Sequence, residues 1–155
     1  MHDSRAVANE MLEIAREEGV TLTPMQLIKL VFFAQGWSLG LRGKRLFAHD
    51  VSAWQYGPVV SQVYWAFNKF GRSPINEKAT DEHGLPYRGA FTADERRLLR
   101  SVVRGYGTRY AYTLSNMTHE PGTPWSKTYR PGMRNRIPID VMQDYFERLA
   151  ARRRH

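Results

Sequence analysis

The chain of 155 residues contains no cysteine. Disulfide bonds, a thiol nucleophile and a thiolate zinc site are therefore excluded. The chain also has no run of about 18 apolar residues, which a membrane-spanning helix needs, because Lys29 and Gln35 interrupt the longest candidate. The first residues lack the apolar stretch of a signal peptide. We therefore expect a cytoplasmic protein without a membrane partner.

Sequence motifs for catalysis and metal binding are missing as well. The five histidines are scattered and match no compact ligand pattern such as H-E-x-x-H. No glycine-rich phosphate loop follows a strand, and no G-x-S-x-G motif supplies a serine nucleophile. Adjacent acidic residues lie near predicted helix ends or in polar loops, where solvent or the helix dipole stabilises them. We predict no catalytic residues, no metal site and no cofactor, and hence no enzymatic activity.

His119 has a specific local setting, because it ends a predicted helix beside Glu120. Two interpretations stay open. The imidazole acts in acid/base chemistry or partner binding, or it is charged and stabilised by the negative end of the helix, by about 0.3–1 kcal/mol.

Positive charge is in excess, with 23 Lys and Arg against 15 Asp and Glu, for a net charge of +8. Such a charge attracts nucleic acid, an anionic membrane or an acidic protein and selects none of them. Eight basic and three acidic residues lie after Trp125, and a basic tail begins at about residue 150. No pair of predicted helices resembles a helix-turn-helix with a basic second helix, so specific DNA recognition is not favoured, whereas non-specific contact with nucleic acid stays open.

The most distinct predicted element is a helix over residues 24–41. Thr23 is a favourable N-cap, Pro24 suits the first helical position and Gln26 completes a capping box. Its polar residues lie first on one side and then on the opposite side: Gln26 and Lys29, then Gln35, Ser38 and Arg42. A helix with this pattern is covered from two directions, so we predict that it is the buried centre of the fold.

Other segments show the apolar period of surface helices and predict a mainly α, single compact domain of about six helices over residues 1–155. The further helices are expected at residues 4–18, 58–70, 93–104, 109–118 and from Asp140 onward. One or two short extended segments are expected near residues 51–56 and 85–90. The long polar connection after Gly71 is either a functional loop or carries a short extended pair.

Trp65 breaks the apolar pattern of its predicted helix and projects roughly 140° from the centre of that stripe. It is either covered by another segment of the chain or reserved for a partner. The following residues are the candidates for contacting a partner: Trp54, Tyr56, Trp65, Lys69, His119, Arg134 and Arg136.

Three sequence segments, LVFFAQGW at residues 30–37, WQYGPVV at 54–60 and THE with PW at 118–125, occur in this order. Their combination resembles the Panacea domain of SocA-like antitoxins, a family also met in phage-associated GepA-type proteins. The resemblance extends over nearly the whole chain.

The resemblance implies a mainly helical domain that neutralises a toxin by direct protein contact, the toxin being encoded beside it in bacteria or phages. One branch of the family is similar to proteolytic adaptors that deliver the toxin to a Clp-type protease, so this alternative stays open, as does a nucleic-acid-binding regulator. Family members accept very different toxins, so the resemblance does not identify the toxin.

Overall fold

The computed structural model describes residues 1–153, which form seven α-helices, one 3₁₀ helix and one antiparallel pair of strands. The elements are α1 (Ser4–Glu17), α2 (Pro24–Arg42), β1 (Ser52–Trp54), β2 (Gly57–Val59), α3 (Ser61–Phe67), η1 (Asn68–Phe70), α4 (Ala93–Tyr106), α5 (Ala111–His119), α6 (Pro124–Thr128) and α7 (Ile139–Arg153). The predicted mainly α fold class is confirmed. Between residues 1 and 153, no helix is both long and apolar enough to cross a lipid bilayer.

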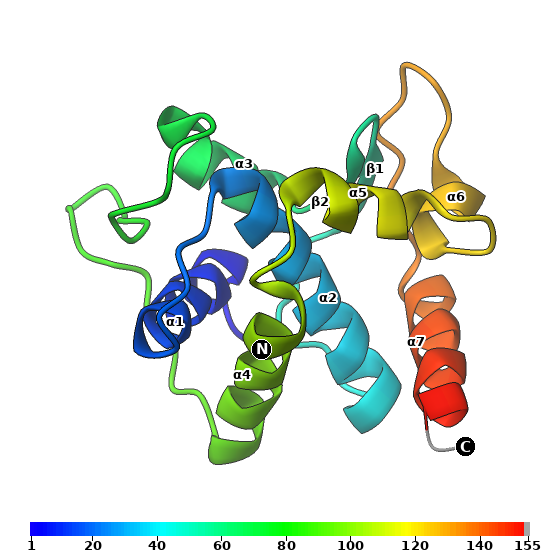
Figure 1. Cartoon of the computed structure of the whole chain (residues 1–155), viewed down its shortest axis with the longest axis horizontal. Coiled ribbons are helices and arrows are strands. Elements are labelled where there is room, and N and C mark those ends of the chain that lie inside the picture. The colour runs from blue at the N-terminus through cyan, green and yellow to red at the C-terminus, as the bar shows by residue number, and fades with distance from the viewer. Residues whose placement is uncertain (154–155) are drawn as a thin grey trace.

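Helix α2 is the centre of the fold, with α4 and α7 on opposite sides of it (Figure 1). The predicted capping box forms, because the Gln26 amide donates to the Thr23 hydroxyl and the Thr23 amide donates to the Gln26 side chain at 2.8 Å. Every residue from 27 to 39 is buried. The helix ends at Gly43, which adopts a left-handed conformation with φ of 66° that glycine tolerates without steric cost. The predicted central helix is therefore confirmed.

The contact between α2 and α7 depends on two glycines of α2. A Cβ atom at Gly40 would lie 2.7 Å from the main-chain carbonyl carbon of Phe146, and one at Gly36 would overlap the Phe146 ring. The missing side chains let the two helices approach closely. The Phe146 ring then packs edge-on against Trp37, with ring centres 5.3 Å apart.

Two buried polar residues of α2 hold the loop that leaves the helix. The Gln35 side chain accepts a hydrogen bond from the Leu46 amide and donates one to the Phe47 carbonyl, both at 2.8 Å. The Ser38 hydroxyl donates to the Lys44 carbonyl at 2.6 Å. The polar side of α2 that the sequence indicated therefore satisfies buried main-chain groups of this loop.

An ion-pair network joins α1 to α4. Three arginines spaced four residues apart on α4 face three glutamates, two in α1 and one directly after it. The pairs are Arg96 with Glu10 at 3.1 Å, Arg100 with Glu17 at 2.6 Å, Arg100 with Glu18 at 2.7 Å and Arg104 with Glu18 at 2.9 Å. The hydrogen bond from Arg100 holds the pKa of Glu18 below its usual value. Much of the positive charge of α4 is thereby neutralised within the chain.

The structure corrects three details of the predicted helices. The helix expected over residues 58–70 begins at Ser61 and continues as η1, because Gly57–Val59 pairs with Ser52–Trp54 to form a hairpin. The stretch around residue 125, where no helix was expected, contains the short helix α6. Helix α5 begins at Ala111 with Tyr110 as its N-cap, two residues after the expected start at residue 109.

The long connection between η1 and α4 contains one isolated bridge, between Thr80 and Pro86, close to the extended segment expected at residues 85–90. Asn9 of α1 holds this connection: its side-chain amide donates to the carbonyls of Ala79 at 2.9 Å and Tyr87 at 3.0 Å, and its oxygen accepts from the Ala79 amide at 2.7 Å. The predicted basic tail starts in the last turn of α7; Arg154 and His155 lie outside the described residues.

Candidate protein-interaction site

The β1–β2 hairpin, helix α3 and the segment before α7 build one aromatic surface. The guanidinium carbon of Arg134 lies 3.8 Å from the centre of the Trp54 ring. The Trp54 ring centre lies 5.0 Å from that of Tyr64, which lies 5.0 Å from that of Trp65. Tyr56 stands in the hairpin turn and is 64% exposed. We call these five residues (Trp54, Tyr56, Tyr64, Trp65 and Arg134) the hairpin surface.

Main-chain pairing explains why Arg134 reaches Trp54. The Ala53 amide donates to the Asn135 carbonyl at 2.8 Å, and the Ile137 amide donates to the Val51 carbonyl at 2.7 Å. Strand β1 is therefore held on both edges, by β2 and by residues 135–137. The indole of Trp125 in α6 also donates to the Trp54 carbonyl at 2.6 Å. These hydrogen bonds fix the hairpin to the rest of the chain.

The exposure of Trp65 bears on the two roles that its sequence position left open. Its side chain is 64% exposed, so the residues from 1 to 153 do not cover it. Its ring contacts Tyr64 edge-on, with the planes at 82°. Tryptophan, tyrosine and arginine are the residues most enriched among those that dominate protein–protein binding energy. This composition suits a surface that binds another protein.

The structure links three of the seven predicted residues, Trp54, Trp65 and Arg134, through ring contacts that include Tyr64. Tyr56 stands two residues after Trp54 in the hairpin turn and is exposed. Arg136 is exposed nearby, where its main chain forms a bridge with Ser52. The Lys69 ammonium instead contacts Glu77 at 3.5 Å. Sequence analysis missed Tyr64, because it falls on the apolar stripe of α3 and its position between two tryptophans depends on the hairpin.

His119 lies beside the hairpin turn and is half-buried. Its ring stacks on Trp125 with ring centres 3.9 Å apart, and its Nε2 atom is buried without a hydrogen-bond partner among residues 1–153. Burial and the nearby Lys29 lower the pKa of His119, although a main-chain hydrogen bond with Tyr56 opposes them. The lowered pKa disfavours the charged imidazole, in contrast to the charged histidine that we considered at this helix end.

Lys29 of α2 lies directly under the hairpin and is fully buried. Its ammonium donates to the Pro58 carbonyl at 3.2 Å, and a Cβ atom at Gly57 would lie 2.9 Å from it. Burial lowers the pKa of Lys29 to about 7. The sequence placed Lys29 on a covered side of α2 but gave no sign of this complete burial. The lysine acts as a support for the turn that presents Tyr56.

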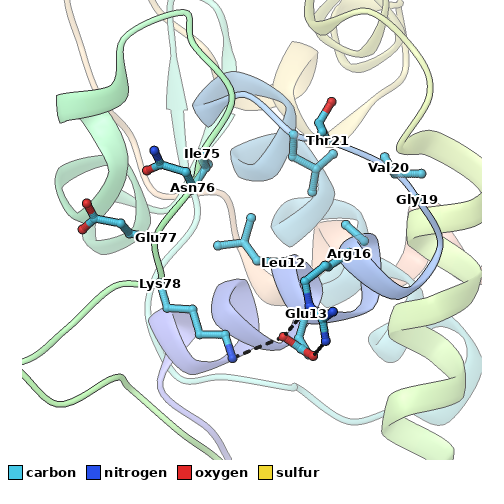
Figure 2. A pocket seen from close by; sticks show the side chains of 12 residues that line it. Leu12, Glu13, Arg16, Gly19, Val20, Thr21, Ile75, Asn76, Glu77 and Lys78 are labelled. Atoms are coloured by element: carbon cyan, nitrogen blue, oxygen red, sulfur yellow. Dashed lines mark hydrogen bonds and ion pairs between the residues drawn. The ribbon is translucent and has the colours of Figure 1, made fainter.

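A separate hollow of about 420 Å³ lies between the end of α1 and residues 75–78 (Figure 2). Glu13 at its rim contacts Lys78 at 3.4 Å and also pairs with Arg16. None of the seven predicted residues lines it. Within the described part of the chain, His, Asp and Glu side chains form no group of three that suits a metal ion. The hairpin surface is therefore the stronger candidate site.

Comparisons with known proteins point in one direction. The family model described as "Antitoxin SocA-like, Panacea domain" matches residues 27–126, a range that contains the hairpin surface except Arg134. The chain is also similar to "Antitoxin SocA" of Caulobacter vibrioides (strain NA1000 / CB15N), with 30% identity over 128 residues that cover 79% of this chain and 68% of the relative. No solved structure matches the chain.

Proposed function

Since the chain belongs to the SocA-like antitoxin family with a Panacea domain, we propose that it neutralises a protein toxin by binding the toxin directly. The hairpin surface carries this proposal, because it combines exposed aromatic rings with an arginine that lies over one of the rings. The toxin is expected to be the product of the adjacent gene, and both proteins are expected in the cytoplasm. No chemical step by this chain is needed.

Exposed aromatic rings give the hairpin surface its capacity to bind. Trp65 and Tyr56 are each 64% exposed, and covering a tryptophan buries on the order of 200 Å². The rings of Trp54 and Tyr64 support Trp65 from behind, and the Trp125 bond holds the hairpin in place. A surface fixed before binding loses little conformational entropy when a partner covers it.

Charge favours a partner with an acidic surface. Arg134 and Arg136 are exposed at one edge of the hairpin surface, and the chain carries a net charge of +8. Complementary charge steers association and raises its rate, most strongly at low ionic strength. Replacing Arg134 and Arg136 by glutamate should therefore slow toxin association and flatten its salt dependence.

Co-expression with the product of the adjacent gene tests the proposal, with cell growth and copurification as the measurements. Trp65→Ala should weaken the complex by about 2 kcal/mol, roughly thirtyfold in Kd. The melting temperature should stay nearly unchanged, because most of the side chain is exposed. Leu85→Ala is the control, because Leu85 is 62% exposed and lies outside the hairpin surface.

Each outcome of the co-expression is informative. Growth rescue with a stable complex that Trp65→Ala weakens supports direct binding. Rescue without a complex contradicts it. Rescue that disappears in a host without its Clp-type protease would indicate delivery of the toxin to that protease. A large loss of stability in Trp65→Ala would mean that Trp65 belongs to the core.

A further inference from the structure

A second surface, built from different residues, lies where α4 and the end of α7 flank the second half of α2 (Figure 1). It is a groove of about 360 Å³. Trp37 and Tyr106 form part of its lining, and Leu41 at its edge is 54% exposed. We propose that this groove, here called the α4 groove, binds a peptide segment of a partner protein that carries an apolar side chain next to a carboxylate.

The aromatic part of the α4 groove is rigid and has its polar atoms satisfied. The Trp37 indole donates to the Tyr106 hydroxyl at 3.0 Å. The Tyr106 ring stacks on Phe33 with ring centres 4.1 Å apart and planes at 1°. A fixed lining of this kind accepts an apolar side chain without rearrangement.

Helix α4 contributes one continuous stripe to the groove. Leu98, Val102 and Gly105 follow one another at helical spacing and line the same side. No heavy atom lies within 4 Å of the position that a Cβ atom at Gly105 would take. A partner side chain can therefore approach the helix backbone at this point.

Two arginines supply the charge. The guanidinium carbon of Arg153 lies 4.6 Å from the Trp37 ring centre, and that of Arg109 lies 6.0 Å from the Tyr106 ring centre. Neither arginine forms an ion pair with another residue of the range 1–153, and the lining includes no acidic residue. Arginines of α4 that face α1 are, in contrast, paired with glutamates. The Nε atom of Arg109 donates to the Gly105 carbonyl at 3.2 Å. Guanidinium groups that form no ion pair within residues 1–153 and lie above an apolar lining complement a carboxylate beside an apolar side chain.

The proposal goes beyond the antitoxin function and does not depend on it. No residue of the hairpin surface lines the α4 groove. Failure of one proposal therefore leaves the other standing. A nucleic acid is a weaker match, because its phosphates would meet the guanidinium groups while the leucine and valine side chains of the groove stayed without an apolar partner.

Two synthetic peptides with the same leucine and phenylalanine centre test the proposal, one flanked by glutamates and the other by lysines. Each is titrated into the full chain and followed by NMR. The Kd of the acidic peptide should be lower than that of the basic peptide by about tenfold or more. Gly105→Leu fills the groove and should abolish binding of the acidic peptide. Its helix should be at least as stable, because leucine is a better helix former than glycine.

Controls separate the groove from general attraction to a basic protein. Ala93→Leu places the same side chain at the start of α4, outside the groove, and should bind the peptide normally. Arg109→Gln with Arg153→Gln should weaken the acidic peptide about tenfold for each arginine removed. Arg152→Gln removes an exposed arginine that lines a different hollow, and it should have little effect.

Three results would overturn the proposal: equal affinity for the two peptides, binding that Gly105→Leu leaves intact, or no spectral change at about 1 mM of acidic peptide, a concentration that detects even a standard binding free energy near −4 kcal/mol.

Discussion

The buried Lys29 under the hairpin should make the free energy of unfolding depend on pH. Burial lowers the pKa of Lys29 to about 7 in the folded chain, against an ordinary value of 10.5. Between these two values the unfolded chain holds a proton on Lys29 that the folded chain has partly or wholly lost. Stability must therefore rise with pH across this window, because the folded state binds fewer protons.

The size of the effect follows from the proton difference. A full proton changes the free energy of unfolding by about 1.4 kcal/mol per pH unit. At pH 7 half of the folded molecules carry the proton, and by pH 9 almost none do. The wild-type chain should therefore gain about 2 kcal/mol over Lys29→Met between pH 7 and pH 9.

Urea unfolding at pH 7, 8 and 9, followed by circular dichroism, measures this difference. Lys29→Met also leaves the Pro58 carbonyl without its donor, but that loss is the same at every pH and does not change the slope. His119 is present in both chains, so its own titration largely cancels when the two are compared. Lys44→Met is the control, because Lys44 is exposed. Parallel stability curves for wild type and Lys29→Met would refute the reasoning.

Two further predictions concern packing and a buried hydrogen-bonded residue. In thermal melts, Gly40→Ala should lower the free energy of unfolding by about 1–3 kcal/mol, because its Cβ would lie 2.7 Å from the Phe146 main chain. Gly105→Ala has open space around its Cβ, so it should raise the free energy of unfolding by up to about 1 kcal/mol in the same experiment. Asn9→Ala should lower the free energy of unfolding by about 3 kcal/mol, because the Ala79 amide and the Tyr87 carbonyl lose their hydrogen-bond partner. The Ala79 carbonyl keeps a bond from the Tyr87 amide. Limited proteolysis should then cut the connection at residues 71–92 first, and a cleavage pattern like that of wild type would contradict this role of Asn9.

The sequence was informative where the determining interactions are local. The capping box of Thr23 and Gln26 and the change of polar side along α2 are both set within a few turns of one helix. They predicted the central helix and its cover from two directions. The exposed position of Trp65 was one of two alternatives, because the helix wheel shows which way a side chain points and not what stands in front of it.

Features that depend on distant segments were not predictable. Pro58 suits the first turn of a helix as well as the edge of a short strand, and only pairing with β1 decides between them. The burial of Lys29 depends on where the hairpin docks. Arg134 reaches Trp54 only because residues 135–137 pair with β1. Each of these outcomes is fixed by main-chain bonds between segments that the local pattern treats as independent.

The ion pairs between α1 and α4 also shape the electric field around the molecule. The first 18 residues contain five acidic and two basic side chains, whereas the last 30 contain eight basic and three acidic ones. Helices α1 and α7 lie on opposite sides of the fold (Figure 1). Because the α1 acids neutralise much of the positive charge of α4, the field is strongest on the α7 side. An acidic protein that approaches in solution is therefore steered toward that side before any contact forms. Added salt screens the charges and weakens this steering.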